Sequence, residues 1–321
     1  MSAFDGPSLV EEALAEIEAH DVFPERGRAL AGEIRRRMRQ GAYRDLDLPG
    51  LCQALTRDLR SSSGDLHLGL RPSGDGPDSR EVRAERMRSG GYGIARVERR
   101  PGNIGLLELR YFAPAGSAGA AMAAAMQLLA DRDALIIDLR RAKGGDPGMI
   151  ALASSYLFDA ADPPRHLNDI HHRDGRVHQW WTLPWLPGPR IGAGAPLALL
   201  TSRETFSGAE EFAWNLRALG RATLLGERTA GAAHPTRSWP IAGGLALVDV
   251  PFARSINPHT GDNWEGRGIR PDLELPAAEA EPRAVAWLLE QLAERARQRG
   301  DAGARARLER HRQALGGSES G

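Results

Sequence analysis

The spacing of apolar residues divides the chain into a helical N-terminal part and a longer part in which strands and helices alternate. In residues 8–61, apolar side chains recur at intervals of three and four, which is typical of amphipathic helices. Beyond residue 92, short apolar runs such as NIGLLELRYF, DALIIDLR and PLALLTS predict buried strands, and helical patterns separate them. This alternation predicts an α/β core, in which sites lie at the carboxyl ends of the strands.

The same patterns predict four segments. Residues 1–72 are expected to form a small N-terminal helical domain. Residues 73–100 begin with a polar, glycine-rich run and are expected to be a linker and the first strand region. Residues 101–281 would form the α/β core, and residues 282–321 a charged C-terminal helix and tail. Within the core, IHHRDGRVHQWWTL predicts a hairpin, because an Asp-Gly turn separates two alternating runs.

Composition narrows the classes of partner. The chain has 42 acidic and 42 basic residues, and a formal net charge of zero argues against nucleic acid as a partner. No run of apolar residues is long enough to span a membrane, and the N-terminus lacks the pattern of a signal peptide. The single cysteine, Cys52, excludes an internal disulfide and lies on an apolar helical face. We therefore expect a cytoplasmic protein without a nucleic-acid or membrane partner.

The stretch TSRETFSGAEEF allows two interpretations of Ser207. The residue lies between a predicted strand and a predicted helix, and Glu210 follows at the spacing of a capping box, so Ser207 can be a helix cap. A serine at the carboxyl end of a strand can also be a nucleophile, provided that a base removes its proton. Local sequence alone favours the cap.

Three further stretches bear on that choice. Gly144 and Gly145 follow a predicted strand, where glycines allow backbone N–H groups to line an oxyanion hole, although an ordinary turn would look the same. His67 lies beside a short strand in SGDLHLGL, where a lone histidine is usually structural. Glu265 lies in a glycine-rich loop in NWEGRGIRPD, where a carboxylate is usually solvated.

Together these stretches resemble the tail-specific (C-terminal processing) serine peptidases. The resemblance spans residues 40–276 and rests on SGDLHLGL, IIDLRRAKGG, the segment from LLTSRETFSGAEEF to GERTAGAAHP, and NWEGRGIRPDLEL. It is strongest to the branch of tricorn protease cores and interphotoreceptor retinoid-binding protein-like domains. The resemblance implies a crotonase-like ββα-type core. Residues 72–102 are too few for the PDZ domain that many members carry.

The resemblance also implies a catalytic set. One branch of the family pairs the serine with a downstream lysine, but Ala232 occupies that position here, and Lys143 is the only lysine in the chain. The tricorn-like branch uses a histidine and a glutamate instead, which implies Ser207, His67 and Glu265, with His67 as base and Glu265 as the carboxylate that orients it. Leu66 replaces a serine of that branch, which leaves open whether Glu265 contacts the histidine differently or is coupled to it through Asp65 or water.

Other roles follow from the same resemblance. The oxyanion donors would be the N–H groups of Gly208 and of Gly144 or Gly145. Substrate contacts are considered for three side chains that also have ordinary structural interpretations: Lys143, His234 and Trp181. His171, His172 and His178 could suggest zinc, but no cysteine or carboxylate cluster accompanies them, so neither a metal nor a cofactor is expected.

Three functions remain open from the sequence, and the last of them is a scaffold or interaction role with a vestigial site. The first is a serine peptidase that acts on a small peptide through an acyl-enzyme on Ser207, with transfer to water or to an amine. The second is a non-catalytic binding module for a retinoid-like or lipid-type ligand, because relatives in this branch are ligand carriers. A carrier needs neither a base nor an oxyanion hole, so the residues favour the enzyme. The partner would be a peptide or small molecule, and a homo-oligomer remains open.

Overall fold

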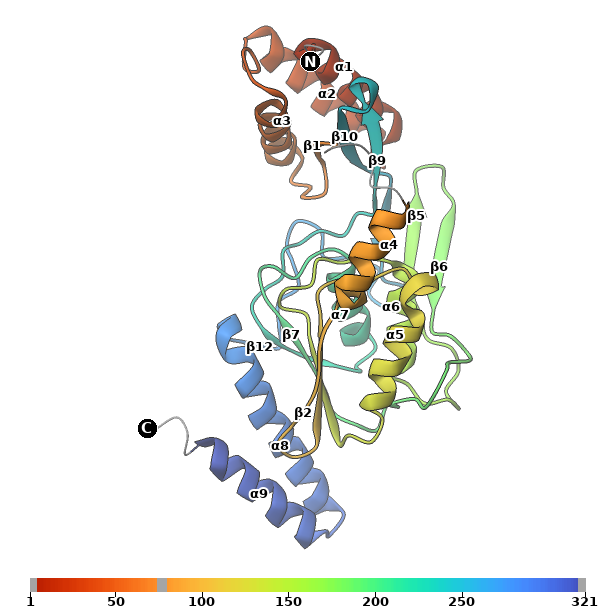
Figure 1. Cartoon of the computed structure of the whole chain (residues 1–321), viewed down its shortest axis with the longest axis vertical. Helices are drawn as coiled ribbons and strands as arrows, with labels where there is room; N and C mark the ends of the chain where they lie inside the picture. Colours follow the sequence, from red (N-terminus) through yellow and green to blue (C-terminus); the bar gives the residue numbers. More distant parts are fainter. Residues whose placement is uncertain (1–4, 74–79, 317–321) are drawn as a thin grey trace.

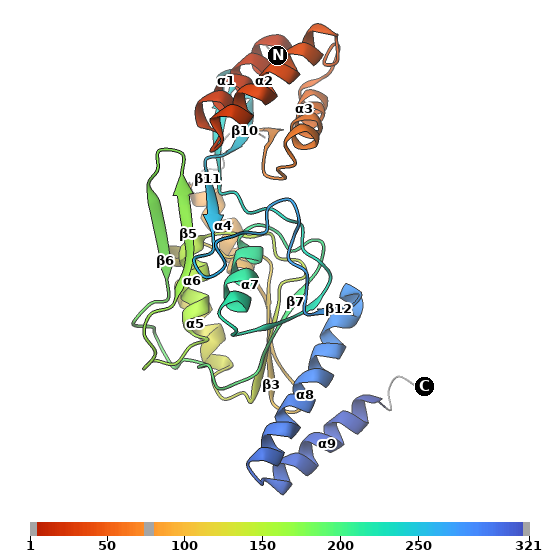
Figure 2. The same ribbon diagram turned by 180° about the vertical axis from the view of Figure 1, so that it is seen from behind.

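The computed structural model describes residues 5–73 and 80–316, and its main chain forms three parts along one axis (Figure 1). Helices α1–α3 lie at one end, an α/β core lies in the middle, and helices α8 and α9 lie at the other end, as the reverse view also shows (Figure 2). Within the described ranges, none of the helices has the length and apolar character that crossing a membrane requires.

A six-stranded sheet forms the centre of the core. Its strand order is β12-β8-β7-β4-β3-β2, and all neighbours are parallel except the antiparallel pair β2 and β3. Helices and loops connect the parallel strands, so the carboxyl ends of β4 and β7 point to the same edge. The strands are β2 (Ile94–Arg100), β3 (Ile104–Leu109), β4 (Ala134–Asp138), β7 (Leu197–Thr201), β8 (Thr223–Gly226) and β12 (Leu273–Glu274).

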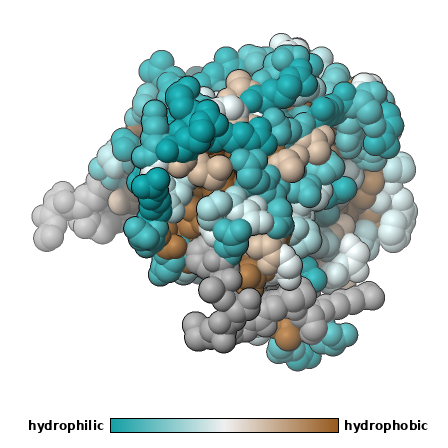
Figure 3. Space-filling view, turned by 90° about the horizontal axis from the view of Figure 1, so that it is seen from above, coloured by the Kyte–Doolittle hydropathy of each residue, from teal (hydrophilic) through white to brown (hydrophobic). Residues whose placement is uncertain are grey.

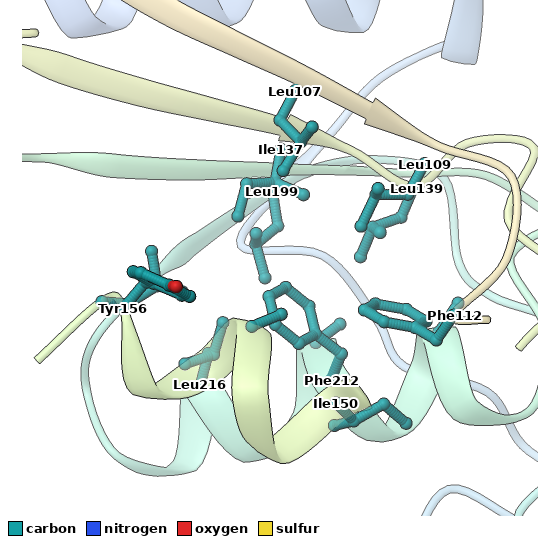
Figure 4. Close-up of a cluster of buried hydrophobic side chains, with 14 of the residues drawn as sticks. Leu107, Leu109, Phe112, Ile137, Leu139, Ile150, Tyr156, Leu199, Phe212 and Leu216 are labelled. Carbon is teal, nitrogen blue, oxygen red and sulfur yellow. The ribbon is translucent and has the colours of Figure 1, made fainter. Parts of the chain in front are cut away.

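Both faces of this sheet are covered. One face packs on α5 (Ala115–Leu128), α6 (Pro147–Ser155) and α7 (Gly208–Ala218), and Figure 4 shows strand residues facing the Phe212 ring of α7. The other face packs on α8 (Ala280–Gln298), which is followed by α9 (Ala302–Gly316). Strands buried on both faces read as continuous apolar runs, which explains their pattern in the sequence. The predicted α/β core is therefore confirmed.

The N-terminal unit is built from two distant parts of the chain. Helices α1 (Gly6–His20), α2 (Pro24–Arg39) and α3 (Leu48–Ser63) share one apolar cluster with strand β1 (Gly69–Pro72). Strand β1 pairs antiparallel with β10 (Ala246–Pro251), which in turn pairs with β9 (Thr236–Ile241). The helices therefore rest on a hairpin that the chain contributes about 180 residues later, a long-range pairing that periodicity cannot reveal. Seen from this end, the surface is mainly hydrophilic, with small apolar areas (Figure 3).

A second hairpin reaches from the core to the N-terminal helices. Strands β5 (His166–His172) and β6 (Val177–Trp181) pair antiparallel, as predicted, and β11 (Ala253–Ile256) pairs with the other edge of β5. At the hairpin tip, Arg173 donates to the carbonyl oxygens of Glu18 and Ala19 at 3.1 and 2.6 Å. A cation at the C-terminus of a helix satisfies its free carbonyl groups, so the tip is attached to α1.

One expected linker segment is partly helical. Residues 73–100 were expected to be a linker and the first strand region, and β2 does lie there. Residues 80–89 form helix α4 (Arg80–Ser89), because REVRAERMRS consists largely of strong helix formers. The glycine-rich part of the run, residues 74–79, lies outside the described residues.

Candidate active site

Ser207 lies at the junction between β7 and α7, at the carboxyl edge of the sheet. It is the N-cap of α7, with φ 54° and ψ −124°. A positive φ is uncommon for a residue with a side chain and costs of order 1–3 kcal/mol. The surrounding contacts must therefore hold the residue in this conformation.

Glu210 supplies one of those contacts. Its carboxylate accepts the Ser207 N–H at 2.9 Å, which is half of the predicted capping box. The same buried carboxylate accepts from Thr229 Oγ1 at 2.5 Å and from the N–H groups of Gly231 and Ala232 at 2.7 and 3.0 Å. Burial raises the pKa of Glu210 to about 7, and these four donors oppose that shift. Glu210 thus links the serine turn to the loop at residues 229–232.

The hydroxyl of Ser207 lies against an imidazole from the other end of the chain. His67 follows the C-terminus of α3, and its Nε2 lies 2.9 Å from Ser207 Oγ. The imidazole packs against the Phe206 ring, with 4.7 Å between ring centroids. Burial lowers the pKa of His67 to about 4, so the ring is neutral at neutral pH. A neutral imidazole at this distance can accept the serine proton.

The other nitrogen of His67 has no direct partner. Among the described residues, none is a hydrogen-bond partner of the buried Nδ1 atom. The backbone N–H of His67 donates to Asp65 Oδ1 at 3.0 Å, so Asp65 holds the histidine through the main chain. The negative charge of Asp65 also opposes the lowering of the His67 pKa.

Asp65 is the centre of a buried polar cluster. Its Oδ2 atom lies 2.6 Å from His234 Nδ1 and 3.0 Å from Arg26 Nη1. Arg26, on α2, also binds Asp21, with its Nη2 3.0 Å from Asp21 Oδ1. Burial of Asp65 raises its pKa, but its partners outweigh that effect and the net pKa lies below the usual range. The carboxylate is therefore ionised, and it connects the N-terminal helices to the His67 loop.

Glu265 reaches this cluster from the opposite side but does not contact His67. Its Oε2 accepts the Ala233 N–H at 2.5 Å and lies 3.6 Å from His234 Nδ1. Its Oε1 is buried and has no hydrogen-bond partner within the described part of the chain. Burial raises the pKa of Glu265 above its usual range. A Ser-His-Glu triad implies a direct contact between the glutamate and His67. In the structure, Glu265 instead lies beside His234, which is hydrogen-bonded to Asp65.

The glycines singled out in the sequence lie together beside Ser207. A Cβ atom at Gly144 would lie 2.8 Å from both Gly208 N and Ser207 Cβ, and one at Gly208 would lie 3.0 Å from Gly145 N. Gly145 has φ 135°, and a Cβ there would lie 2.1 Å from the Phe112 carbonyl oxygen. Phe112 and Gly145 form an isolated parallel β-bridge, in which the Phe112 N–H donates to Gly144 O and the Asp146 N–H donates to Phe112 O. The N–H of Gly145 takes no part in these two hydrogen bonds. Positive φ and contacts below 3.0 Å therefore require glycine at residues 144 and 145, and a side chain at residue 208 would be tightly packed.

The three expected substrate contacts lie in different surroundings. Lys143 is exposed, and its Nζ binds the carboxylate of Glu204 at 2.9 Å. Trp181 lies on β6 and stacks on His166, with ring centroids 4.1 Å apart. His234 lies inside the polar cluster. Only His234 is connected to the Ser207 and His67 pair by hydrogen bonds, through Asp65.

One group of side chains within the described residues has metal-ligand geometry: Asp65, His234 and Glu265 have ligand atoms within 4.8 Å of one another. Arg26 lies 3.0 Å from the shared Asp65 oxygen and already supplies a positive charge there. A fixed guanidinium opposes the entry of a metal cation. The group therefore fits a hydrogen-bonded network better than a metal centre.

An open groove of about 800 Å³ lies beside the residue that precedes His67 in the sequence. Leu66 lies on it, together with residues of the loops after β8 and β12. Apolar side chains and stems line most of it, and charged groups lie at its rim. The other lining residues are Arg203, Glu227, Arg228, Thr229, Ala230, Glu274, Leu275 and Pro276.

Comparisons with known proteins agree with this architecture. The sequence model of peptidase family S41 matches residues 103–275. A lipoprotein from Streptococcus agalactiae has a similar structure at 16% identity, with a TM-score of 0.62 over 90% of this chain and 98% of that one. The photosystem II D1 C-terminal processing protease matches at 15% identity, with a TM-score of 0.51 over 86% of this chain and 94% of that one. The tricorn protease matches at 12% identity, with a TM-score of 0.55 over 86% of this chain and 35% of that one.

Proposed function

The chain belongs to peptidase family S41 and is a serine peptidase by family, and on this premise we propose that it cleaves peptides through an acyl-enzyme on Ser207. His67 is the general base. The observation that carries this proposal is the 2.9 Å contact between His67 Nε2 and Ser207 Oγ, two atoms whose residues lie 140 positions apart. Neither residue requires the other for local folding.

The chemistry proceeds in two steps. His67 Nε2 takes the proton of Ser207 as Oγ attacks the scissile carbonyl carbon, and the carbonyl oxygen becomes an oxyanion. The N–H groups of Gly208 and of Gly144 or Gly145 stabilise this charge, with Gly208 at the positive end of α7. The imidazolium then gives its proton to the leaving amine. Water, deprotonated by His67, releases the acyl group and restores Ser207.

Asp65 and its partners act on His67 as positioning residues. Asp65 holds the histidine backbone, and its ionised carboxylate favours the imidazolium that forms during the reaction. His234 and Arg26 hold Asp65 from two sides. Glu265 contributes through its contact with His234. This arrangement replaces the direct carboxylate-histidine contact with a network that includes an N-terminal helix.

The groove beside Leu66 is the proposed site for the peptide substrate. Leu66, the residue before His67, lines the groove, which is open, so an extended chain can enter it. Its apolar lining favours a peptide with apolar side chains, and the exposed Arg203 can bind main-chain carbonyl or carboxylate groups. Lys143 is paired with Glu204, so it is not part of this proposal.

A fluorophosphonate probe tests the nucleophile directly. The wild-type protein is expected to form a stable adduct with a fluorophosphonate, because an activated serine attacks phosphorus as it attacks a carbonyl carbon. Peptide mapping by mass spectrometry should locate the adduct on Ser207. Heat-unfolded protein is the control and should not react. A folded protein that carries no adduct on Ser207 would contradict the proposal and favour the non-catalytic binding module.

The rate of labelling is expected to depend on pH through His67. Because burial lowers its pKa to about 4, His67 is already the neutral base well below pH 6. The pseudo-first-order rate should therefore rise through about pH 4 and reach a plateau before pH 6, whereas an exposed histidine would give a midpoint near 6.5. A midpoint between 6 and 7 would contradict the buried, neutral state of His67.

Folding must be followed in the same pH series, because His67 also affects stability. Its pKa in the folded protein lies below the unfolded value, so the unfolded state binds more protons between about pH 4 and 6.5. This contribution to stability is fully present above that window and is lost as the pH falls through it. Circular dichroism at each pH separates loss of the folded state from protonation of the base.

A further inference from the structure

A cavity lies at the opposite end of the core from Ser207. It is partly open to solvent, has a volume of about 700 Å³ and is lined by α8, α9, the turn between β2 and β3, and the loops before β4 and β7. Both ribbon views show α8 and α9 at the end of the molecule remote from α1–α3 (Figures 1 and 2). A volume of this size is typical of sites for small molecules.

Arg132 forms the buried part of the cavity wall. Its side chain is only 8% exposed, and its Nη1 and Nη2 donate to the carbonyl oxygens of Ala130 and Ile191 at 3.1 and 2.7 Å. Its Nε is buried and has no partner among the described residues. Within those residues the guanidinium also lacks an ion pair with any carboxylate. The negative charges of Asp133 and Asp131 act on Arg132, but neither forms an ion pair with it, so burial of this guanidinium is only partly compensated and an anion close to it would be stabilised.

More arginines surround this position. Arg295, Arg299 and Arg307 line the same cavity, and the positive charges of Arg132 and Arg295 both act on Arg221 in the adjoining depression. In the part of the chain that the structure describes, none of these five arginines is in an ion pair. Elsewhere on the same two helices, Arg297 pairs with Glu294 and Arg305 pairs with Glu309. Four arginines that form no ion pair among the described residues therefore line one cavity.

Three carboxylates also line the cavity. The charge of Asp133 acts on Arg132 and that of Asp159 acts on Arg221, and each of the three also accepts a hydrogen bond. Asp133 Oδ2 accepts from Asn103 Nδ2 at 3.2 Å, and Asp159 Oδ1 accepts the Ala193 N–H at 3.3 Å. Asp301 Oδ1 accepts the Ala304 N–H at 2.8 Å in the first turn of α9. Four arginines face these three aspartates. Arg132 and Arg295 also donate to backbone carbonyl oxygens, whereas the side chains of Arg299 and Arg307 have no hydrogen-bond partner among the described residues and can donate to a ligand.

From these observations we propose that the cavity binds a phosphoryl group, either free or as part of a small molecule or a lipid headgroup. The planar guanidinium presents paired donors that match the oxygens of a phosphate, and several arginines together can neutralise a dianion. Arg299 and Arg307 are exposed at the rim and would contact the ligand first, whereas Arg132 would supply the charge at the base. The proposal concerns binding alone and stands or fails independently of Ser207.

Calorimetric titration with inorganic pyrophosphate tests the proposal. The wild-type protein should show saturable binding, and the double variant Arg299→Ala/Arg307→Ala should bind about tenfold or more weakly, because two charge-assisted contacts are lost. The matched control is Arg305→Ala/Arg310→Ala, which removes the same charge from exposed positions of α9 that do not line the cavity. It should bind within about twofold of the wild type. Arg132 is left intact because it holds two loop carbonyl groups.

Sedimentation with vesicles separates the two sources of phosphate. Vesicles of phosphatidylcholine with phosphatidic acid are compared with phosphatidylcholine alone, using the same variants. If Arg299→Ala/Arg307→Ala loses pyrophosphate binding and the control variant keeps it, the result supports a free or small-molecule phosphate as the ligand. If Arg299→Ala/Arg307→Ala no longer sediments with vesicles that contain phosphatidic acid and the control variant still does, the result supports a lipid headgroup as the ligand. Failure to bind either probe, or equal loss in both double variants, would overturn the proposal.

Discussion

Replacement of Ser207 by alanine is expected to lower kcat for peptide hydrolysis by about 10⁴-fold or more while leaving the fold intact. The hydroxyl makes the contact with His67 and would form the acyl-enzyme, whereas the backbone N–H of residue 207 would still bind Glu210. The variant should also form no adduct with a fluorophosphonate. The measurement is release of a fluorescent product from a quenched peptide with apolar side chains, found by screening the wild-type protein against a peptide library.

The matched control for this variant is Ser61→Ala. Ser61 is an exposed serine in α3, and its replacement should leave kcat within about twofold of the wild type, as is usual for surface substitutions. Circular dichroism and thermal unfolding of all three proteins confirm that a loss of activity is not a loss of structure. If Ser207→Ala retained most of the activity, a different nucleophile would be required.

The second large effect is expected for His67→Gln, which should lower kcat/KM by about 10³-fold or more, because the serine then has no base. Members of a catalytic unit are strongly non-additive, so the double variant Ser207→Ala/His67→Gln should be no less active than Ser207→Ala alone. The loss should appear mainly in kcat, since the base acts in the chemical step. Fluorophosphonate labelling of His67→Gln should slow by a similar factor.

His311→Gln is the control for the histidine. His311 is exposed on α9 at the far end of the molecule, and its replacement should leave kcat/KM unchanged within about twofold. Additive losses in the double variant would mean that Ser207 and His67 act independently, and the proposed pair would then be wrong. Normal labelling of His67→Gln would assign the role of base to another residue.

The core of the fold could be predicted from periodicity because its signals are local. Apolar runs predicted β3, β4 and β7, and the Asp-Gly turn predicted the hairpin of β5 and β6. The N-terminal unit was less accessible. Its three helices follow from their own amphipathic patterns, but its sheet combines β1 with β9 and β10, and no local pattern specifies which distant hairpin a strand will join.

In the candidate site, too, some residues could be predicted from local sequence, whereas others depend on the tertiary fold. Ser207, Gly208, Gly144 and Gly145 lie at turns after strands, and such turns can be read from sequence, so the structure places these residues side by side as the motifs suggested. The capping interpretation also accounts for part of the geometry, since Glu210 binds the Ser207 backbone. Its further bonds to the loop at residues 229–232 depend on where that loop folds.

The partners of the histidine were the least predictable part. The resemblance pointed to Glu265, yet it is Asp65 that binds the His67 backbone, Arg26 and His234 bind Asp65, and Glu265 lies beside His234. The clue in the sequence was the departure at Leu66, which left open a connection through Asp65. Nothing in the sequence identified Arg26, because a charged residue in an amphipathic helix usually faces solvent.

The sequence by itself determined the class of the protein: the alternation of strands and helices, the serine turn, the glycine pair, and a single lysine that lies far from the family's dyad position. These features depend on neighbouring residues and on backbone conformations that residue type controls. The tertiary structure alone decided which charges meet, because packing brings Arg26, Asp65, His67, Ser207 and His234 together from two ends of the chain. It also decided which arginines remain unpaired, since an ion pair depends on distances that chain order does not set.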